Sequence, residues 1–101
     1  MNGKNTPASI YVTYAITASG KVQGVFYRQF CLRQAKELEI NGTVQNLPDS
    51  SVQLIVSGPV TALDELVKRC KIGPPRSKVE SINIVKMEFI PFKEFSVLPS
   101  Q

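Results

Sequence analysis

Two glycines and an arginine form the part of this sequence whose residue types and spacing are best suited to chemistry. Gly20 and Gly24 lie four positions apart, and Arg28 follows four positions after the second glycine. Glycine lets the backbone turn tightly and approach a ligand closely, so successive N–H groups can gather into a concavity that binds an anion. An arginine beside that concavity can hold a phosphate through two parallel hydrogen bonds. The same spacing also fits a structural interpretation, a tight strand-to-helix connection with a surface arginine.

The residues missing from the sequence narrow the chemistry further. There is no histidine, so the side chain most often used for proton transfer near neutral pH is excluded. A zinc site would need Cys31 and Cys70, which lie far apart in the sequence, together with carboxylates, so we expect no metal site. Both cysteines are expected to pack as small apolar groups. Antiparallel helices could bring them together, but a disulfide is not expected in a cytoplasmic protein.

Hydrophobic periodicity places the two glycines between a strand and a helix. The β-branched and aromatic run at residues 10–18 predicts a strand, and apolar residues at helical spacing predict a helix over residues 25–39. Asn41-Gly42 is typical of the position just after a helix. The remaining pattern predicts a hairpin of strands 42–47 and 51–57, a helix from Gly58-Pro59 to Gly73, a strand over residues 78–88 and a short edge strand within residues 92–98.

This βαββαβ order, with one further strand, predicts an α+β sandwich of the ferredoxin-like type. Both helices should cover one face of a four- or five-stranded antiparallel sheet. The first and second strands then run in the same direction with one strand between them, so their ends lie about 10 Å apart. Asn46 ends the second strand, and we expect it to converge with Arg28. Its amide can donate and accept, which suits orienting a water molecule, although asparagine is also common in turns that bind their own backbone.

Two segments of the sequence resemble the signatures of the acylphosphatase family. The first is Gly20-Lys21-Val22-Gln23-Gly24-Val25-Phe26-Tyr27-Arg28. It is similar to the family's Gly-x-Val-Gln-Gly-Val loop, which is followed three residues later by arginine. The second, from Gly42 to Val52, is similar to the family's Gly-x-Val-x-Asn-x-x-Asp-Gly-x-Val. The separation of the two segments also fits, and the resemblance covers residues 10–98, which we expect to form the domain.

The resemblance implies hydrolysis of the anhydride between a carboxylate and a phosphate, with no metal or cofactor. By resemblance the catalytic residues are Arg28, which binds the phosphate, and Asn46, which holds the attacking water. Ser50 stands where the family usually has glycine, so a positive φ there would cost on the order of 1 kcal/mol. The phosphate-binding residues implied by the loop are Gly20, Lys21, Val22, Gln23, Gly24 and Val25.

Composition and charge set the partners that we expect. The formal net charge of +4 favours anionic partners only weakly, because the basic residues are scattered and form no stripe typical of nucleic-acid binding. RNA-recognition domains share this element order, but the third strand here, residues 51–57, lacks their stacking aromatics. We therefore expect a small acyl phosphate as substrate, inorganic phosphate or sulfate as ligands, and no nucleic acid.

Two further expectations concern the location and organisation of the chain. No apolar run approaches the ~20 residues that a membrane-spanning helix needs, so no membrane partner is expected. Residues 1–9 lack the apolar stretch of a secretory signal and are expected to form a flexible lead-in, with a cytoplasmic location and a monomer as defaults. The alternative function left open is a non-catalytic, anion-binding or regulatory acylphosphatase-like domain.

Overall fold

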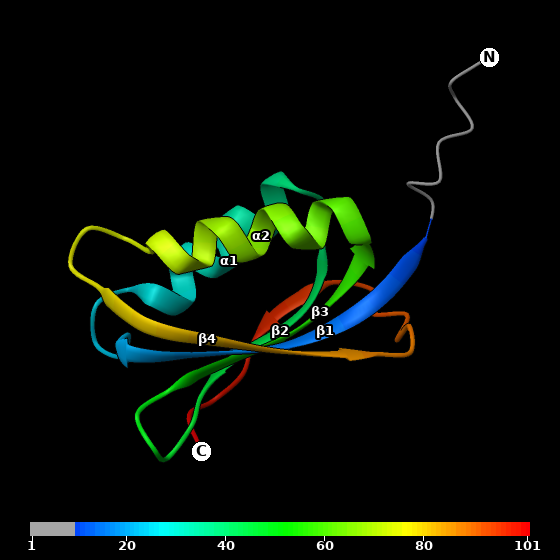
Figure 1. The fold of residues 1–101 in the computed structure, drawn as a ribbon. Coiled ribbons are helices and arrows are strands. Elements are labelled where there is room, and N and C mark those ends of the chain that lie inside the picture. The colour runs from blue at the N-terminus through cyan, green and yellow to red at the C-terminus, as the bar shows by residue number, and fades with distance from the viewer. Residues whose placement is uncertain (1–9) are drawn as a thin grey trace.

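Two helices lie on one face of a five-stranded sheet in the computed structural model, which describes residues 10–101 (Figure 1). The expected lead-in at residues 1–9 lies outside the described residues. Neither of the described helices is long and apolar enough to cross a membrane. In chain order the elements are β1 (Tyr11–Lys21), α1 (Tyr27–Glu37), β2 (Asn41–Asn46), β3 (Val52–Pro59), α2 (Val60–Ile72), β4 (Lys78–Met87) and β5 (Phe95–Val97).

The order of strands across the sheet, β4-β1-β3-β2-β5, confirms the predicted ferredoxin-like α+β fold. β1 pairs antiparallel with β3 and β4, and β2 pairs antiparallel with β3. The last strand differs from the prediction, because β5 pairs parallel with β2 and makes the sheet mixed rather than wholly antiparallel. Its direction follows from the topology. β4 runs antiparallel to β2 and therefore finishes at the end of the sheet where β2 begins, so a strand that starts there and pairs with β2 runs in the same direction as β2.

The first strand is longer than its apolar pattern indicates. β1 was expected to break at Ser19, but it pairs with β4 as far as Lys21, with a bulge between Ser19 and Gly20. A side chain at Gly20 would overlap the carbonyl oxygen of Lys78, so glycine here lets two strands approach each other. The expected break is wrong because long-range pairing with β4 outweighs the local preference of glycine for a turn.

The ends of both helices also differ from the prediction. α1 begins at Tyr27 rather than residue 25, and the chain leaves it through Glu39, a left-handed residue with φ 58°. Gly42 therefore lies within β2 and does not end the helix. Pro59 is the last residue of β3 and precedes the first turn of α2. These are shifts of a few residues at element boundaries, where local signals are weakest.

The core lies between the helices and the sheet and follows the alternation of the strands. Ile16 and Ala18 of β1, and Val44 of β2, are fully buried on the helix-covered face. α2 contributes Leu63 and Leu66. Because successive side chains of a strand point to opposite faces, Asn46 lies on the same face as Val44, at the end of the sheet where α1 begins. The core therefore brings Asn46 and the start of α1 to one place.

Tyr27 joins the start of α1 to the end of α2. Its side chain is buried, and its hydroxyl donates a hydrogen bond of 2.7 Å to the carbonyl oxygen of Cys70. Burial raises the pKa of this hydroxyl. Cys31 and Cys70 are both free and buried, as expected, with their Sγ atoms 3.9 Å apart, and the neighbouring Cys70 thiol and burial raise the pKa of Cys31. The first turn of α1 is thus held by contacts inside the core.

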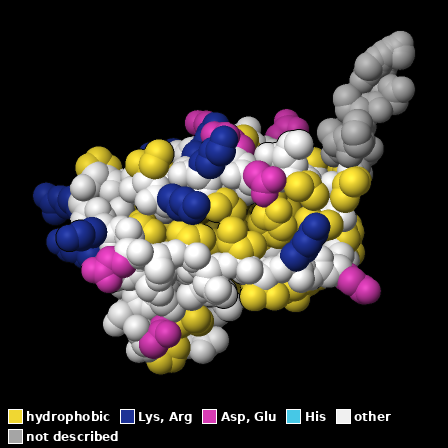
Figure 2. Space-filling model, in the orientation of Figure 1, with side chains coloured by type: hydrophobic (Ala, Val, Ile, Leu, Met, Phe, Trp, Pro, Cys, Tyr) yellow, Lys and Arg dark blue, Asp and Glu magenta, His cyan; other side chains and the backbone are white. Residues whose placement is uncertain are grey.

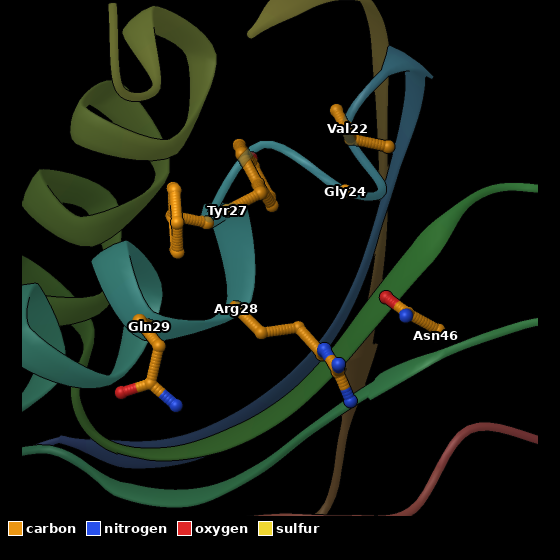
Figure 3. A pocket seen from close by; sticks show the side chains of 7 residues that line it. Val22, Gly24, Tyr27, Arg28, Gln29 and Asn46 are labelled. Atoms are coloured by element: carbon orange, nitrogen blue, oxygen red, sulfur yellow. The ribbon is translucent and has the colours of Figure 1, made fainter. Parts of the chain in front are cut away.

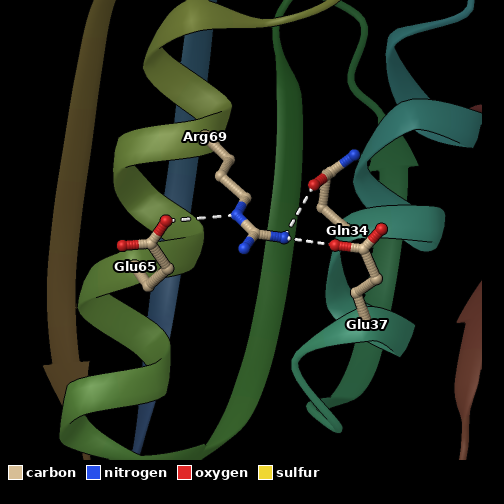
Figure 4. Close-up of polar contacts among 4 residues, drawn as sticks. All are labelled: Gln34, Glu37, Glu65 and Arg69. Atoms are coloured by element: carbon tan, nitrogen blue, oxygen red, sulfur yellow. Dashed lines mark hydrogen bonds and ion pairs between the residues drawn. The ribbon is translucent and has the colours of Figure 1, made fainter.

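A second link between the helices lies near the surface. The Arg69 guanidinium of α2 contacts Glu65 of its own helix at 3.2 Å (Figure 4). It also contacts Glu37 of α1 at 2.8 Å and the side-chain carbonyl of Gln34 at 2.9 Å. These groups are partly exposed, so salt screens the ion pairs and their contribution to stability is small. They link the last turn of α2 to the C-terminal half of α1.

β4 is an edge strand and is more exposed than its alternating apolar residues predict. Val79 and Ile82 are half-buried, whereas Ile84 and Met87 are exposed. Figure 2 shows apolar side chains gathered on the face of the molecule that carries this edge. The second face of β4 gains no covering layer, because both helices lie on one side of the sheet (Figure 1).

Ser50 adopts a positive φ of 76°, so the condition under which serine costs free energy at this position is met. We expect Ser50→Gly to raise the free energy of unfolding by about 0.5–1 kcal/mol, since relief of the left-handed strain exceeds the entropy that glycine loses on folding. Ser50→Ala is the matched control, because alanine keeps the Cβ atom and its strain. Urea unfolding measures both variants, and equal midpoints for glycine and alanine would contradict the explanation.

Candidate functional site

A cavity of about 250 Å³ opens at the start of α1 (Figure 3). Arg28 enters it from the first turn of α1, and Asn46 enters it from the last position of β2. The structure thus brings together the two residues that topology predicted would converge. The reason is the strand order, which places β1 and β2 parallel on either side of β3. The cavity is lined by Val22, Gly24, Phe26, Tyr27, Arg28, Gln29 and Asn46.

The loop before α1 supplies a run of unpaired donors. Backbone N–H groups from Gln23 to Gln29 donate to no backbone carbonyl among residues 10–101. Gly24 adopts φ 72° and faces open space, since a Cβ atom added there would meet nothing within 4 Å. Unpaired amides of a loop and of a helix N-terminus, on the rim of one cavity, form an arrangement that binds anions.

The six expected phosphate-binding residues do not all line the cavity. Val22 and Gly24 do, and the Val22 N–H donates to the Gly20 carbonyl oxygen at 3.1 Å. Gly20 and Lys21 belong to β1, where they pair with β4. The side chain of Val25 is buried in the core. The candidate loop is therefore shorter than the sequence indicated, because β1 extends into its first two positions.

Gln23 acts through its side chain, a role that the loop motif does not indicate. Its Nε2 atom donates to the carbonyl oxygens of Leu47 at 3.0 Å and Ser51 at 2.8 Å. These two carbonyls lie on either side of the turn between β2 and β3. Gln23 thus ties the loop before α1 to the hairpin that carries Asn46.

The side-chain oxygen of Asn46 is a buried polar atom without a hydrogen-bond partner among residues 10–101. The Nδ2 atom of the same side chain donates to Ser100 Oγ at 3.1 Å. Buried polar atoms without a partner are rare and are commonly satisfied by water or a ligand. The side chain therefore has one anchored end and one acceptor available to a water molecule.

Arg28 is half-buried, and no carboxylate of residues 10–101 lies within ion-pair distance of it. The one hydrogen bond that its side chain donates to residues 10–101 is long, 3.4 Å from Nη1 to the Leu98 carbonyl oxygen. A guanidinium has five N–H donors, so most of them stay available. The cavity thus carries a positive charge that no acidic side chain nearby offsets, which favours an anionic ligand.

The segment after β5 contacts both candidate residues, and sequence reasoning missed it. Leu98 contacts Arg28 and Ser100 contacts Asn46, as given above, and the Gln101 N–H donates to the Asn46 carbonyl oxygen at 3.2 Å. Gln45 Nε2 donates to the Pro99 carbonyl oxygen at 2.9 Å. No local pattern in residues 98–101 signals these contacts, because they depend on β5 lying beside β2.

A short hydrogen-bonded turn supports the hairpin after Asn46. The Ser51 hydroxyl and N–H donate to Asp49 Oδ1 at 2.5 and 3.0 Å, and these bonds hold the pKa of that carboxyl below its usual value. The turn is therefore most strongly held when Asp49 is ionised.

From this turn we expect a pH-dependent difference between the wild type and Asp49→Asn. The carboxyl of Asp49 has a lower pKa in the folded state than in the unfolded state, so its ionisation stabilises the fold at pH values above the unfolded-state pKa. This stabilisation is lost as the pH falls through the folded-state pKa. The variant should be less stable than the wild type at pH 7, and the difference should disappear at a pH below the folded-state pKa of Asp49. Urea midpoints at both pH values test this, and a difference that persists in acid would assign it to another cause.

Removing the Gln23 side chain, which links the loop before α1 to the hairpin, should weaken both the fold and anion binding. Gln23→Ala removes two hydrogen bonds, so we expect about 1–2 kcal/mol less unfolding free energy and severalfold weaker binding of inorganic phosphate. Gln53→Ala, on the opposite face of β3 from the core, is the matched control. Calorimetry measures binding and urea unfolding measures stability. If the phosphate affinity of Gln23→Ala equals that of the wild type, the two Gln23 hydrogen bonds do not position the loop for anion binding.

Several known proteins are similar to this chain in sequence and in structure. The family model described as Acylphosphatase matches residues 14–97. An acylphosphatase of Rhizorhabdus wittichii is 39% identical over 84 residues, which cover 83% of each chain. The crystal structure of acylphosphatase from Bacillus subtilis superposes with a TM-score of 0.84 at 33% identity and covers 86% of this chain and 98% of that chain. HypF of T. kodakarensis matches with a TM-score of 0.77 at 26% identity, over 91% of this chain but only 12% of HypF.

Proposed function

Because this chain belongs to the acylphosphatase family, we propose that its cavity binds the phosphate of an acyl phosphate and that Arg28 and Asn46 promote its hydrolysis. Acylphosphatase activity, a hydrolase activity, follows from the family and from relatives that match most of the chain. The roles of single residues are the part that we propose.

One observation carries the proposal, the meeting of three unsatisfied groups at one cavity. They are the unpaired amides from Gln23 to Gln29, the Arg28 guanidinium without a carboxylate partner, and the buried Oδ1 atom of Asn46. The first two are donors that suit phosphate oxygens, and the third is an acceptor that suits water. A phosphate and a water molecule together would satisfy all three. Inorganic phosphate and sulfate should bind as competing ligands for the same reason.

In the proposed reaction Asn46 Oδ1 accepts a hydrogen bond from the attacking water, while Ser100 holds the other end of the amide. The water oxygen forms a bond to phosphorus as the bond from phosphorus to the carboxylate oxygen breaks. The carboxylate leaves with that electron pair, and a phosphate oxygen of the substrate takes the proton of the water. Arg28 and the loop amides stabilise the charge on the transferred phosphoryl group. Catalysis would rest on positioning and electrostatics, and a carboxylate leaving group needs little protonation.

The second candidate function is an anion-binding domain with little turnover. The match to HypF favours it, because there the same fold makes up 12% of a longer chain. Such a domain would keep the phosphate-binding loop and lose the positioned water. It would therefore bind inorganic phosphate without hydrolysing an acyl phosphate.

Hydrolysis of benzoyl phosphate in the presence of a chelator distinguishes the two functions. We expect turnover by the wild type and a loss of at least about 100-fold in both Arg28→Ala and Asn46→Ala, as is typical when a transition-state donor or positioning group is removed. Arg28→Ala should also lose binding of inorganic phosphate, whereas Asn46→Ala should keep most of it.

Two matched variants control for loss of charge and of amide groups. Lys36→Ala removes a cation from the exposed face of α1, and Gln53→Ala removes an amide from the face of β3 opposite the core. Both should retain activity. If the wild type binds phosphate without turnover, the chain functions as an anion-binding domain and not as an enzyme. Turnover by Arg28→Ala would show that this residue has no role in the mechanism.

A further inference from the structure

Phe26 occupies an unfavourable position on the rim of the cavity. Its side chain is 77% exposed, and its backbone is left-handed, with φ 63°. Exposure of a large aromatic ring and a left-handed conformation of a bulky residue both cost free energy. Such outliers gather at functional sites, where surrounding structure maintains them. Phe26 is also the residue just before α1, where it makes no side-chain cap hydrogen bond.

A second cavity, of about 320 Å³, lies on the other side of Phe26. It shares Phe26 and Gln29 with the cavity that contains Arg28, so the two adjoin. Its remaining wall combines the apolar side chains of Phe30, Pro74 and Pro75 with the charged side chain of Arg33, and it comes from α1 and from the segment after α2. The residues that line it are Phe26, Gln29, Phe30, Arg33, Pro74 and Pro75.

In-line displacement sets the direction in which the acyl group must extend. The attacking and leaving oxygens lie on opposite sides of phosphorus. If Asn46 holds the water, the leaving carboxylate faces away from Asn46. In the view of Figure 3, Asn46 and Gln29 lie on opposite sides of Arg28, and Gln29 also lines the second cavity. A leaving group directed away from Asn46 would extend toward the side of Arg28 on which Gln29 lies.

We propose that Phe26 is a specificity-determining residue whose exposed ring is the surface on which the acyl group of the substrate lies. The Phe26 ring and the apolar residues Phe30, Pro74 and Pro75 of the second cavity favour acyl phosphates with a flat, apolar acyl group, such as an aromatic one, over those with a short one. Offset stacking against an aromatic ring and removal of apolar surface from water supply the preference. This inference rests on the proposed roles of Arg28 and Asn46, because they orient the substrate.

The test compares benzoyl phosphate with acetyl phosphate, which share the phosphate and differ in the acyl group. In Phe26→Ala we expect kcat/KM for benzoyl phosphate to fall about fivefold to tenfold, mainly through KM, while acetyl phosphate changes less than about twofold. Phe26→Tyr should restore the wild-type ratio. Phe89→Ala, which removes an exposed ring beside Tyr11 and away from the cavity, should leave the ratio unchanged.

A purely structural role of Phe26 would give a different result. Inhibition by inorganic phosphate reports the state of the loop, and we expect its inhibition constant to be unchanged in Phe26→Ala. Phe26→Gly removes the ring and suits the left-handed backbone, so it provides a second variant if the alanine protein folds poorly. Equal losses for both substrates, weaker phosphate inhibition, or an unchanged ratio in both variants would overturn the inference.

The outcome for Phe26 is separable from the outcome for the proposed function. If Arg28→Ala abolishes turnover of both substrates and the Phe26 variants keep the wild-type ratio, only the specificity inference fails. If Arg28→Ala still hydrolyses both substrates, the proposed function fails whatever the Phe26 variants do.

Discussion

Burial of Tyr27 is the constraint on which the geometry of the site depends. Tyr27 is the first residue of α1, and both its ring and its hydrogen bond to Cys70 lie inside the core. The unpaired amides before it and Arg28 after it therefore extend from an anchored helix end. Electrostatic stabilisation of a phosphoryl group requires donors that are already in place, since donors that must reorganise during the reaction contribute less.

The remaining parts of the site come from segments that are distant in the sequence and are tied together by polar side chains. Gln23 connects the loop to the β2–β3 hairpin, and Ser100 connects Asn46 to the segment after β5. The hairpin itself is held by the Asp49–Ser51 hydrogen bonds. The sheet order brings these segments to one end, and the side-chain hydrogen bonds then determine their orientation.

Several residues around the cavity depart from the ordinary rules of packing and pairing. Phe26 is left-handed and exposed, and Arg28 lacks a carboxylate partner among the described residues. Asn46 Oδ1 is the one buried side-chain polar atom without a hydrogen bond in that part of the chain. The core is apolar, and other departures, such as the exposed Ile84 and Met87 of β4 and the left-handed Glu39, involve no unpaired buried polar atom. A folded chain tolerates such departures where a ligand can compensate them, which is a physical reason to locate function there.

The types and order of the elements, and the two segments that resemble the acylphosphatase signatures, could be predicted from the sequence because periodicity and short motifs are local properties. The convergence of Arg28 and Asn46 at one end of the sheet was predictable too, since it follows from strand direction. Three features could not be predicted and come from tertiary contacts. β1 continues through Gly20, β5 runs parallel to β2, and the side chain of Gln23 bonds to the hairpin. Each of these features depends on contacts with residues that are distant in the sequence. A local pattern cannot indicate them, because the stabilising free energy comes from the distant partner.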